Sequence, residues 1–226
     1  MSESLDIILM PLHRQIGQDQ ADLTGVYLAE IPRRSARGRG QDRLILYMAL
    51  TGNAPLAPGK VEQVLERLAQ TFYKTPGSVT AALRTVTESL NSFLLDRNLR
   101  NTNTGRQATG LLTALVVRDQ TLYLSQSGPV HAFASFQGEP QHLYDPQISG
   151  RGLGLSRTPS IRYYQAQLTA GDVVVLSTQP SSSWNPASFT EMAGQGLESL
   201  SRRLMSGDDL DLNAVVLQAR KGTGKV

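Results

Sequence analysis

Most of the side chains that could form a catalytic or binding site in this chain are carboxylates, hydroxyls and arginines. Cysteine is absent, and histidine occurs only as His13, His131 and His142. Thiolate metal sites are therefore excluded, and a histidine-rich zinc site is not expected. No Gly-x-Ser-x-Gly sequence accompanies the histidines, so a Ser-His-Asp triad has little support. Hydrolytic metal chemistry would have to rest on Asp and Glu oxygens.

One concentrated run of positive charge occupies residues 33–39, with arginines at 33, 34, 37 and 39. Such a run could bind nucleic acid, an acidic protein or a phosphopeptide. No aromatic residue is interleaved with the arginines, and the net charge of the whole chain is only +3. We therefore favour a solvated loop here, and nucleic acid is not a predicted partner.

Two glycine-containing segments imitate nucleotide-binding loops without satisfying them. Residues 150–154, Gly-Arg-Gly-Leu-Gly, lack the flanking strand and helix of a dinucleotide fingerprint, and residues 222–225 lack the first glycine and the hydroxyl residue of a P-loop. Both are predicted to be surface segments. The single tryptophan, Trp184, follows three serines and could either anchor a partner or pack over a sheet.

Runs rich in β-branched and aromatic residues, bounded by Gly, Pro or polar residues, predict strands over much of the chain. The expected strands are 5–11, 25–31, 44–50, 110–117, 121–127, 130–136, 161–168, 172–177 and 212–218. Residues 168–180 are typical of a tight Gly-Asp turn that leads into a fully buried strand.

Apolar residues at helical spacing predict two consecutive amphipathic helices, one carrying Val61 to Phe72 and one starting near Ser78. Shorter helices are expected after Pro186, where residues 188–191 form a capping-box pattern, and at 197–205. Helices segregated from antiparallel strands predict an α+β fold. Two sheets in a sandwich, with the helix pair on one face and the later helix on the other, would bury every apolar stripe.

The length predicts a single domain over residues 1–219, followed by a basic polar tail or linker at 220–226. That tail would allow a larger parent protein. The N-terminal residues are polar and acidic rather than a signal peptide. No apolar run approaches the roughly 20 residues that a membrane helix needs, so we expect a cytoplasmic chain without membrane insertion.

The order of these elements resembles the PPM family of metal-dependent Ser/Thr protein phosphatases, a four-layer αββα sandwich, over about residues 5–219. Five motif positions carry the resemblance. In chain order they are 14–19 for Arg-x-x-Asn-Glu-Asp, 48–53 for the first six residues of Val-Ala-Asp-Gly-Met-Gly-Gly, 128–133 for Gly-Asp-Ser-Arg-Ala-Tyr, 177–179 for Ser-Asp-Gly and 211–214 for Asp-Asn-x-Thr.

The resemblance implies roles for a few residues and shows most of the family's ligands replaced. Arg14 would be a vestigial phosphate-binding residue, and Asp19 and Asp211 would be the remaining metal ligands, with Asp208 and Asp209 as alternative alignments for the last. The degenerate metal-ligand positions are Gln18, Leu50 and Thr178. Each surviving residue also has a structural alternative, because surface arginines and turn aspartates are common.

Two divalent ions held side by side need several carboxylates to offset their mutual repulsion. Two aspartates could support one weakly bound Mg²⁺ or Mn²⁺ ion but not a dinuclear centre. The sequence therefore predicts a pseudophosphatase without a cofactor, acting in bacterial signalling as a protein-binding or regulatory module. The expected partner is a protein, with a phosphorylated segment as one candidate.

Two other functions compete with this prediction. The chain could be an active but divergent phosphatase that recruits carboxylates from Asp22, Asp42, Asp145 or Asp208. It could also be a nucleic-acid-binding module that uses residues 33–43, whose binding would depend steeply on salt.

Overall fold

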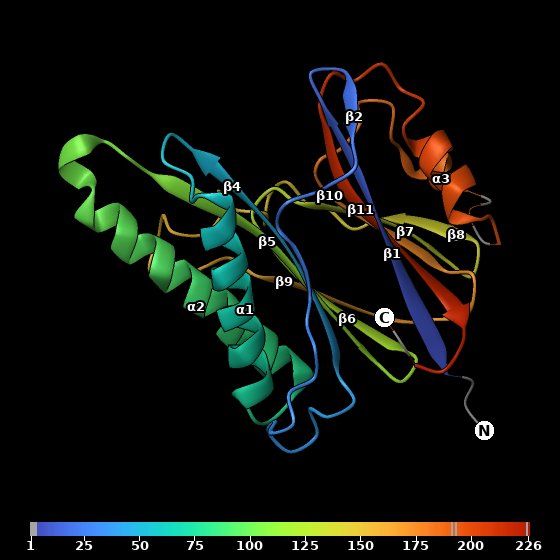
Figure 1. Ribbon diagram of the computed structural model, residues 1–226, viewed down its shortest axis with the longest axis horizontal. Coiled ribbons are helices and arrows are strands. Elements are labelled where there is room, and N and C mark those ends of the chain that lie inside the picture. Colours follow the sequence, from blue (N-terminus) through green and yellow to red (C-terminus); the bar gives the residue numbers. More distant parts are fainter. Residues whose placement is uncertain (1–3, 191, 193, 225) are drawn as a thin grey trace.

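Two antiparallel sheets lie face to face, with helices on both outer faces (Figure 1). The computed structural model describes residues 4–190, 192, 194–224 and 226. In the first sheet the strands are ordered β2-β1-β11-β10-β7-β8, and in the second β3-β4-β5-β6-β9. The α+β sandwich predicted from the sequence is confirmed.

The strand bounds agree with most of the predicted runs. The first sheet comprises β1 (Leu5–Gln15), β2 (Gln18–Gln20), β7 (His131–Phe136), β8 (Glu139–His142), β10 (Val173–Gln179) and β11 (Leu212–Lys221). The second comprises β3 (Val26–Leu28), β4 (Arg43–Gly52), β5 (Ala108–Arg118), β6 (Thr121–Ser127) and β9 (Arg162–Gln167).

Two long helices, α1 (Pro58–Lys74) and α2 (Val79–Arg100), cover the outer face of the second sheet (Figure 1). The short helix α3 (Leu197–Leu204) covers the first. Ser78 caps α2 by accepting a hydrogen bond from the Ala81 amide at 3.1 Å, as its sequence position predicted. Among the residues that the structure describes, no helix has the length and apolar character that a bilayer span requires.

Strand alternation produces three apolar layers. In β4, Leu46 points toward α1 and α2, whereas Ile45 and Tyr47 point toward the other sheet. A third layer, which includes Phe133 and Leu200, lies between the first sheet and α3. A shift of one residue along a strand therefore moves a side chain from one layer to another.

The structure differs from the predicted elements in several places. The expected helix after Pro186 is a short 3₁₀ turn, η2 (Pro186–Phe189), and its capping box is formed by Asn185 and Ser188 instead of residues 188 and 191. Glu191 lies outside the described residues. Strands β2 and β8 were not predicted, and β11 continues to Lys221, so the first two residues of the predicted tail belong to the sheet. The remaining 3₁₀ turn, η1 (Thr102–Thr104), follows α2.

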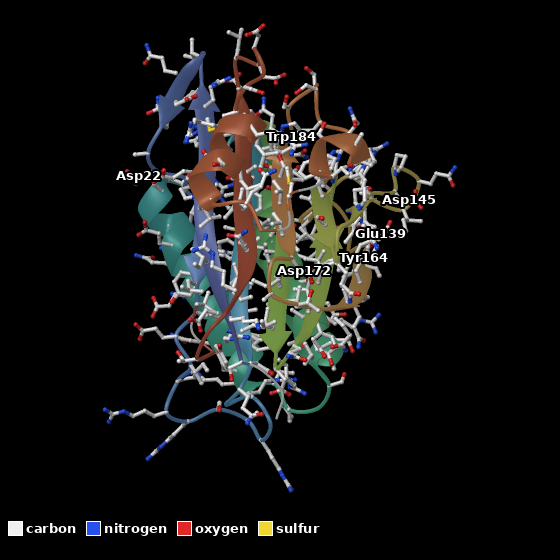
Figure 2. All side chains as sticks on the ribbon, turned by 90° about the vertical axis from the view of Figure 1, so that its right-hand side faces the viewer. Asp22, Glu139, Asp145, Tyr164, Asp172 and Trp184 are labelled. Atoms are coloured by element: carbon white, nitrogen blue, oxygen red, sulfur yellow. The ribbon has the colours of Figure 1, made fainter. Side chains whose placement is uncertain are left out.

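The turn before β10 has the predicted Gly-Asp form. Gly171 has φ 102°, and the buried carboxylate of Asp172 accepts hydrogen bonds from the amides of Thr169 and Gln137, each at 2.7 Å. Figure 2 shows Asp172 at the centre of the molecule, against the strands of the first sheet. This aspartate therefore shapes the turn.

Candidate functional site

The predicted phosphate and metal positions of the first sheet meet at one end of the sandwich. Strand β1 ends there and β11 begins there, since Arg14 pairs with Leu212. Strand β10 ends beside them, since Ser177 pairs with Ala214. The structure thus brings Arg14, together with the residues near 178 and 211, to one end, as expected for a site built from strand ends.

A hydrogen-bonded group of three side chains, Tyr47, Thr178 and Asn213, joins the two sheets at this end. The Tyr47 hydroxyl donates to Oδ1 of Asn213 at 2.5 Å and lies 3.2 Å from Oγ1 of Thr178. Burial raises the pKa of Tyr47 to about 12, so the phenol stays protonated. We call this the tyrosine cluster.

A β-bulge directs Thr178 into the tyrosine cluster. Ser177 pairs with Ala214 and Gln179 pairs with Asn213, so Thr178 is the extra residue of β10. The Ser177 hydroxyl donates to the backbone carbonyl of Asn213 at 2.7 Å and stabilises this geometry. Bulges commonly re-aim one side chain beside a functional site.

A row of polar side chains extends from Tyr47 across the second sheet. Thr113 pairs with Tyr47, Gln126 with Thr113, and Arg162 with Gln126, so all four share the face turned toward the first sheet. Thr113, Gln126 and Arg162 are buried. The Thr113 hydroxyl and the Gln126 amide form no hydrogen bond within the described part of the chain. The interior at this end is therefore polar.

Arg162 places a positive charge in this row. Its guanidinium donates to Ser149 Oγ at 2.8 Å and to the carbonyls of Gly128 and Val130 at 2.9 and 3.3 Å. It forms no salt bridge among the residues that the structure describes. Burial lowers the pKa of Arg162. The group is a buried cation held by neutral acceptors.

Arg14, the predicted phosphate-binding residue, is engaged by the protein itself. Its Nε donates to Asp19 at 2.6 Å, and its two terminal nitrogens donate to the carbonyls of Gly207 and Met205 at 2.6 and 2.9 Å. The hydrogen bond with Asp19 raises the pKa of Arg14. These contacts join the β1–β2 hairpin to the segment that follows α3.

The predicted carboxylate ligands are engaged in local hydrogen bonds as well. Asp211 accepts from the Ile16 amide at 3.0 Å, at the tip of the β1–β2 hairpin. Asp209 accepts from the hydroxyls of Ser181 and Ser182, and these hydrogen bonds, Ser181 first, lower the pKa of Asp209. Asp19 pairs with Arg14. Each carboxylate stabilises a turn or loop of the first sheet.

Two degenerate positions lie away from the tyrosine cluster. Leu50 packs against the core on the helix side of β4, whereas alternation places Ala49 on the same face as Tyr47. The residue of β4 that faces the other sheet at this level is therefore alanine, which also has no donor atom. Gln18 is exposed on β2.

A two-metal hydrolytic centre does not fit this set of donors. Two divalent ions about 3.5–4 Å apart need bridging and flanking carboxylates. The groups between the sheets are instead a phenol, hydroxyls, amides and the guanidinium of Arg162, which repels cations. Within the described ranges, no three His, Asp or Glu side chains gather closely enough to hold an ion.

Sequence reasoning missed Tyr47, Asn213 and Arg162. The signal that could have found Tyr47 was the alternation of β4, because Leu44 and Leu46 belong to one face and Ile45 and Tyr47 to the other. No comparable signal marked the arginine as buried. Trp184 packs over the first sheet, with its Nε1 donating to the Leu204 carbonyl at 3.0 Å, which matches the packing alternative.

No family model matches this sequence, and no curated protein is similar to it in sequence. Solved structures do share its fold. The Ser/Thr phosphatase Stp1 of Staphylococcus aureus is 12% identical with a TM-score of 0.69, and the alignment covers 98% of each chain. The S. agalactiae serine/threonine phosphatase is 14% identical with a TM-score of 0.66, over 96% of this chain and 100% of that one.

The catalytic domain of the serine/threonine phosphatase PstP, solved with two manganese ions, is 15% identical. Its TM-score is 0.60, and the alignment covers 96% of this chain and 100% of that chain. The chain therefore has the fold of the PPM-type serine/threonine phosphatases over nearly its whole length. At 12–15% sequence identity, the similarity to these structures establishes the fold alone.

Proposed function

We propose that this chain is a catalytically inactive PPM-type domain that acts as a protein-binding or regulatory module in bacterial signalling. The observation that carries the proposal is the tyrosine cluster. The Tyr47 phenol hydrogen-bonds to both Thr178 and Asn213 between the sheets, at the end where the resemblance places metal-binding carboxylates. The chemistry of these groups, with Arg162 farther along the same face of the second sheet, disfavours divalent cations, and we propose no resident cofactor.

The positions of the other carboxylates weigh against an active but divergent phosphatase. Asp22 follows β2 and Asp145 follows β8, which are the two edge strands of the first sheet, and Figure 2 shows them on opposite sides of the molecule. Asp42 precedes β4, at the other end of that strand from the site, where it is buried in an ion-pair cluster. Only Asp208 lies beside the predicted ligands.

The tip of the β1–β2 hairpin supports a protein as the partner. Ile16 is 80% exposed and Leu210 is 67% exposed, and the Gly17 amide donates to the Leu210 carbonyl at 2.7 Å. Ile16 has φ 51°, a conformation that is costly for a β-branched residue. Such strain persists where the surroundings enforce it and is common at binding surfaces. These two residues present an apolar tip beside the site.

A single phosphate group cannot contact Arg14 and the basic run at once. Leu5 and Arg14 lie at opposite ends of the long strand β1, and the basic run lies beside the Leu5 end. At about 3.3 Å per residue the two arginine groups are on the order of 30 Å apart. Arg14 and the basic run therefore belong to two separate surfaces.

Titration calorimetry with Mn²⁺ and Mg²⁺, followed by a p-nitrophenyl phosphate assay on the same sample, tests the inactive assignment. We expect no binding at millimolar metal and no turnover, because the donors between the sheets are neutral or cationic. If one weak ion does bind through Asp19 and Asp211, the D19N/D211N variant should lose it. Tight binding of two ions with turnover would make the chain a working phosphatase.

Replacing Ile16 by asparagine should raise the free energy of unfolding by about 1 kcal/mol, because asparagine adopts positive φ at low cost and suits the first position of this two-residue turn. The matched control Ile16→Val keeps the β-branched side chain and should give no gain. Chemical denaturation of the three proteins measures the difference. Equal stability of the asparagine and valine variants would mean that the hairpin tip is not strained.

A further inference from the structure

The loop between β3 and β4 carries the densest positive charge of the chain. It contains Arg33, Arg34, Arg37 and Arg39 together with one aspartate, Asp42. The first three arginines are exposed, whereas Arg39 and Asp42 are fully buried. We call residues 32–42 the basic loop. It lies at the lower end of the molecule in Figures 1 and 2, away from β2.

A buried ion-pair cluster fixes the conformation of the basic loop. Arg39 Nη1 donates to Asp42 Oδ2 at 2.9 Å, and Arg118 donates to both oxygens of Asp42 at 2.6 and 2.9 Å. Arg39 also donates to the carbonyls of Thr75, Gly77 and Ser78, between α1 and α2. The loop is thus attached to the two helices by a side chain with no solvent exposure.

Two further contacts complete the anchoring. The Ala36 amide donates to the Tyr73 carbonyl at 2.8 Å, and the Tyr73 hydroxyl donates to the Asp42 carbonyl at 2.8 Å. Arg39 also lies 4.9 Å from the ring centroid of Phe72. An unanchored arginine-rich loop would lose conformational entropy on binding, and anchoring reduces that cost in advance. The exposed arginines are therefore held by a pre-organised backbone.

The charges near the loop do not neutralise it. Within the described chain, the only carboxylate bonded to a loop residue's guanidinium is Asp42, which two arginines already share. The cluster of Arg39, Asp42 and Arg118 therefore keeps one net positive charge. Lys74, at the end of α1 next to Tyr73, is exposed as well. Together these groups form a cationic surface.

A pocket of about 330 Å³ opens beside the basic loop. On the loop side it is lined by Ile31, Gly40, Gln41 and Arg43. Ile31 is 43% exposed and offers an apolar contact next to polar walls. A pocket of this size accommodates one or two side chains of an extended peptide rather than a globular surface.

We propose that the basic loop and its pocket bind an acidic peptide segment of a partner protein. Guanidinium groups form paired hydrogen bonds with carboxylates, and three exposed arginines within five residues suit a segment rich in Glu and Asp. The loop carries no aromatic side chain on which a base could stack. The exposed carboxylate of Asp119 lines the pocket, so the acidic side chains of the peptide are expected at the exposed arginines and a neutral side chain in the pocket.

Fluorescence anisotropy with a labelled synthetic peptide of alternating glutamate and serine tests the proposal. The R33Q/R34Q/R37Q variant should bind the peptide about tenfold more weakly than the unchanged protein, since three charge pairs of modest strength are lost. The matched control R100Q/R202Q/R203Q removes the same number of charges from exposed positions on α2 and α3. Its affinity for the peptide should fall by less than about twofold. Retention of the far-ultraviolet circular dichroism spectrum checks that both variants fold.

Two outcomes would overturn the proposal. An equal loss in both variants would show that the peptide responds to overall charge and not to the basic loop. Tighter binding of a DNA duplex of the same charge, lost in the loop variant, would assign the surface to nucleic acid. Neither outcome changes the result expected of the metal titration. The proposal that the chain is catalytically inactive is therefore tested independently of the proposal for the basic loop.

Discussion

Replacing Asp42 by asparagine is expected to lower the free energy of unfolding by about 3–5 kcal/mol. The carboxylate is fully buried and accepts hydrogen bonds from two guanidinium groups, those of Arg39 and Arg118. Asparagine would leave Arg39 charged, buried and without a counter-ion. Because small proteins are stable by only about 5–15 kcal/mol, this loss would be a large fraction of the total.

The matched control for this prediction is Asp119→Asn. Asp119 is exposed and has φ 54°, a conformation that asparagine tolerates well. Its replacement should change the free energy of unfolding by no more than about 0.5 kcal/mol. Urea denaturation of both variants at neutral pH measures the contrast. Similar values for the two would mean that solvent reaches the ion-pair cluster and screens it.

Acidification from about pH 6.5 to about pH 4 should destabilise the protein through a histidine pair. His131 Nδ1 lies 3.0 Å from His142 Nε2, so one ring donates a hydrogen bond to the other. His131 also stacks on Tyr144, with ring centroids 4.0 Å apart. Burial lowers the pKa of His131 to about 4, with smaller contributions from His142 and Arg162, and burial also lowers the pKa of His142.

The sign of this effect follows from proton uptake. Below pH 6.5 an unfolded histidine binds a proton that the folded His131 binds only near pH 4. The contribution of neutral His131 to the free energy of unfolding is therefore fully present above pH 6.5, and it declines as the pH falls toward 4. The difference between the folded and unfolded pKa values of His131 corresponds to about 3 kcal/mol at most. Solvent around the half-buried ring reduces this figure to about 1–2 kcal/mol.

A comparison of variants isolates the pair from the carboxylates that titrate in the same range. His131→Phe keeps an aromatic ring on Tyr144 and removes the titrating group, so it should lose most of this pH dependence. The control His13→Gln, on β1 far across the first sheet from β7, should keep it. Guanidinium denaturation at several pH values measures how steeply the free energy of unfolding of each variant changes with pH. An unchanged slope in the phenylalanine variant would contradict the role of the pair.

Local sequence patterns were sufficient for the elements whose partners are near in the chain. Ser78 and the apolar spacing after it located α2, and the three polar residues 118–120 located the turn between β5 and β6. The segregation of helices from antiparallel strands also predicted the sandwich. The elements that were missed or misplaced, among them β2, β8 and η2, are short, and neighbouring structure determines their ends.

The site is formed by hydrogen-bond partners that lie far apart in the chain. Arg14 has its partners at Met205 and Gly207, and Tyr47 has its partners at Thr178 and Asn213. The resemblance of residues 48–53 to a family motif suggested Leu50 as the position that faces the metals. A shift of one residue reverses the face of a strand, and the sheet register places Leu50 toward the helices.

The sequence alone determined which side chains were available: no cysteine, few histidines and no carboxylate at Thr178 or anywhere from residue 43 to 52. Those residue types limit the chemistry whatever the fold. Only the tertiary structure decided how the remaining groups are used, with Asp19 and Asp211 bonded to the β1–β2 hairpin and Arg162 buried between the sheets. The physical reason is that hydrogen bonding and burial depend on neighbours that the sheet topology brings together from distant parts of the chain.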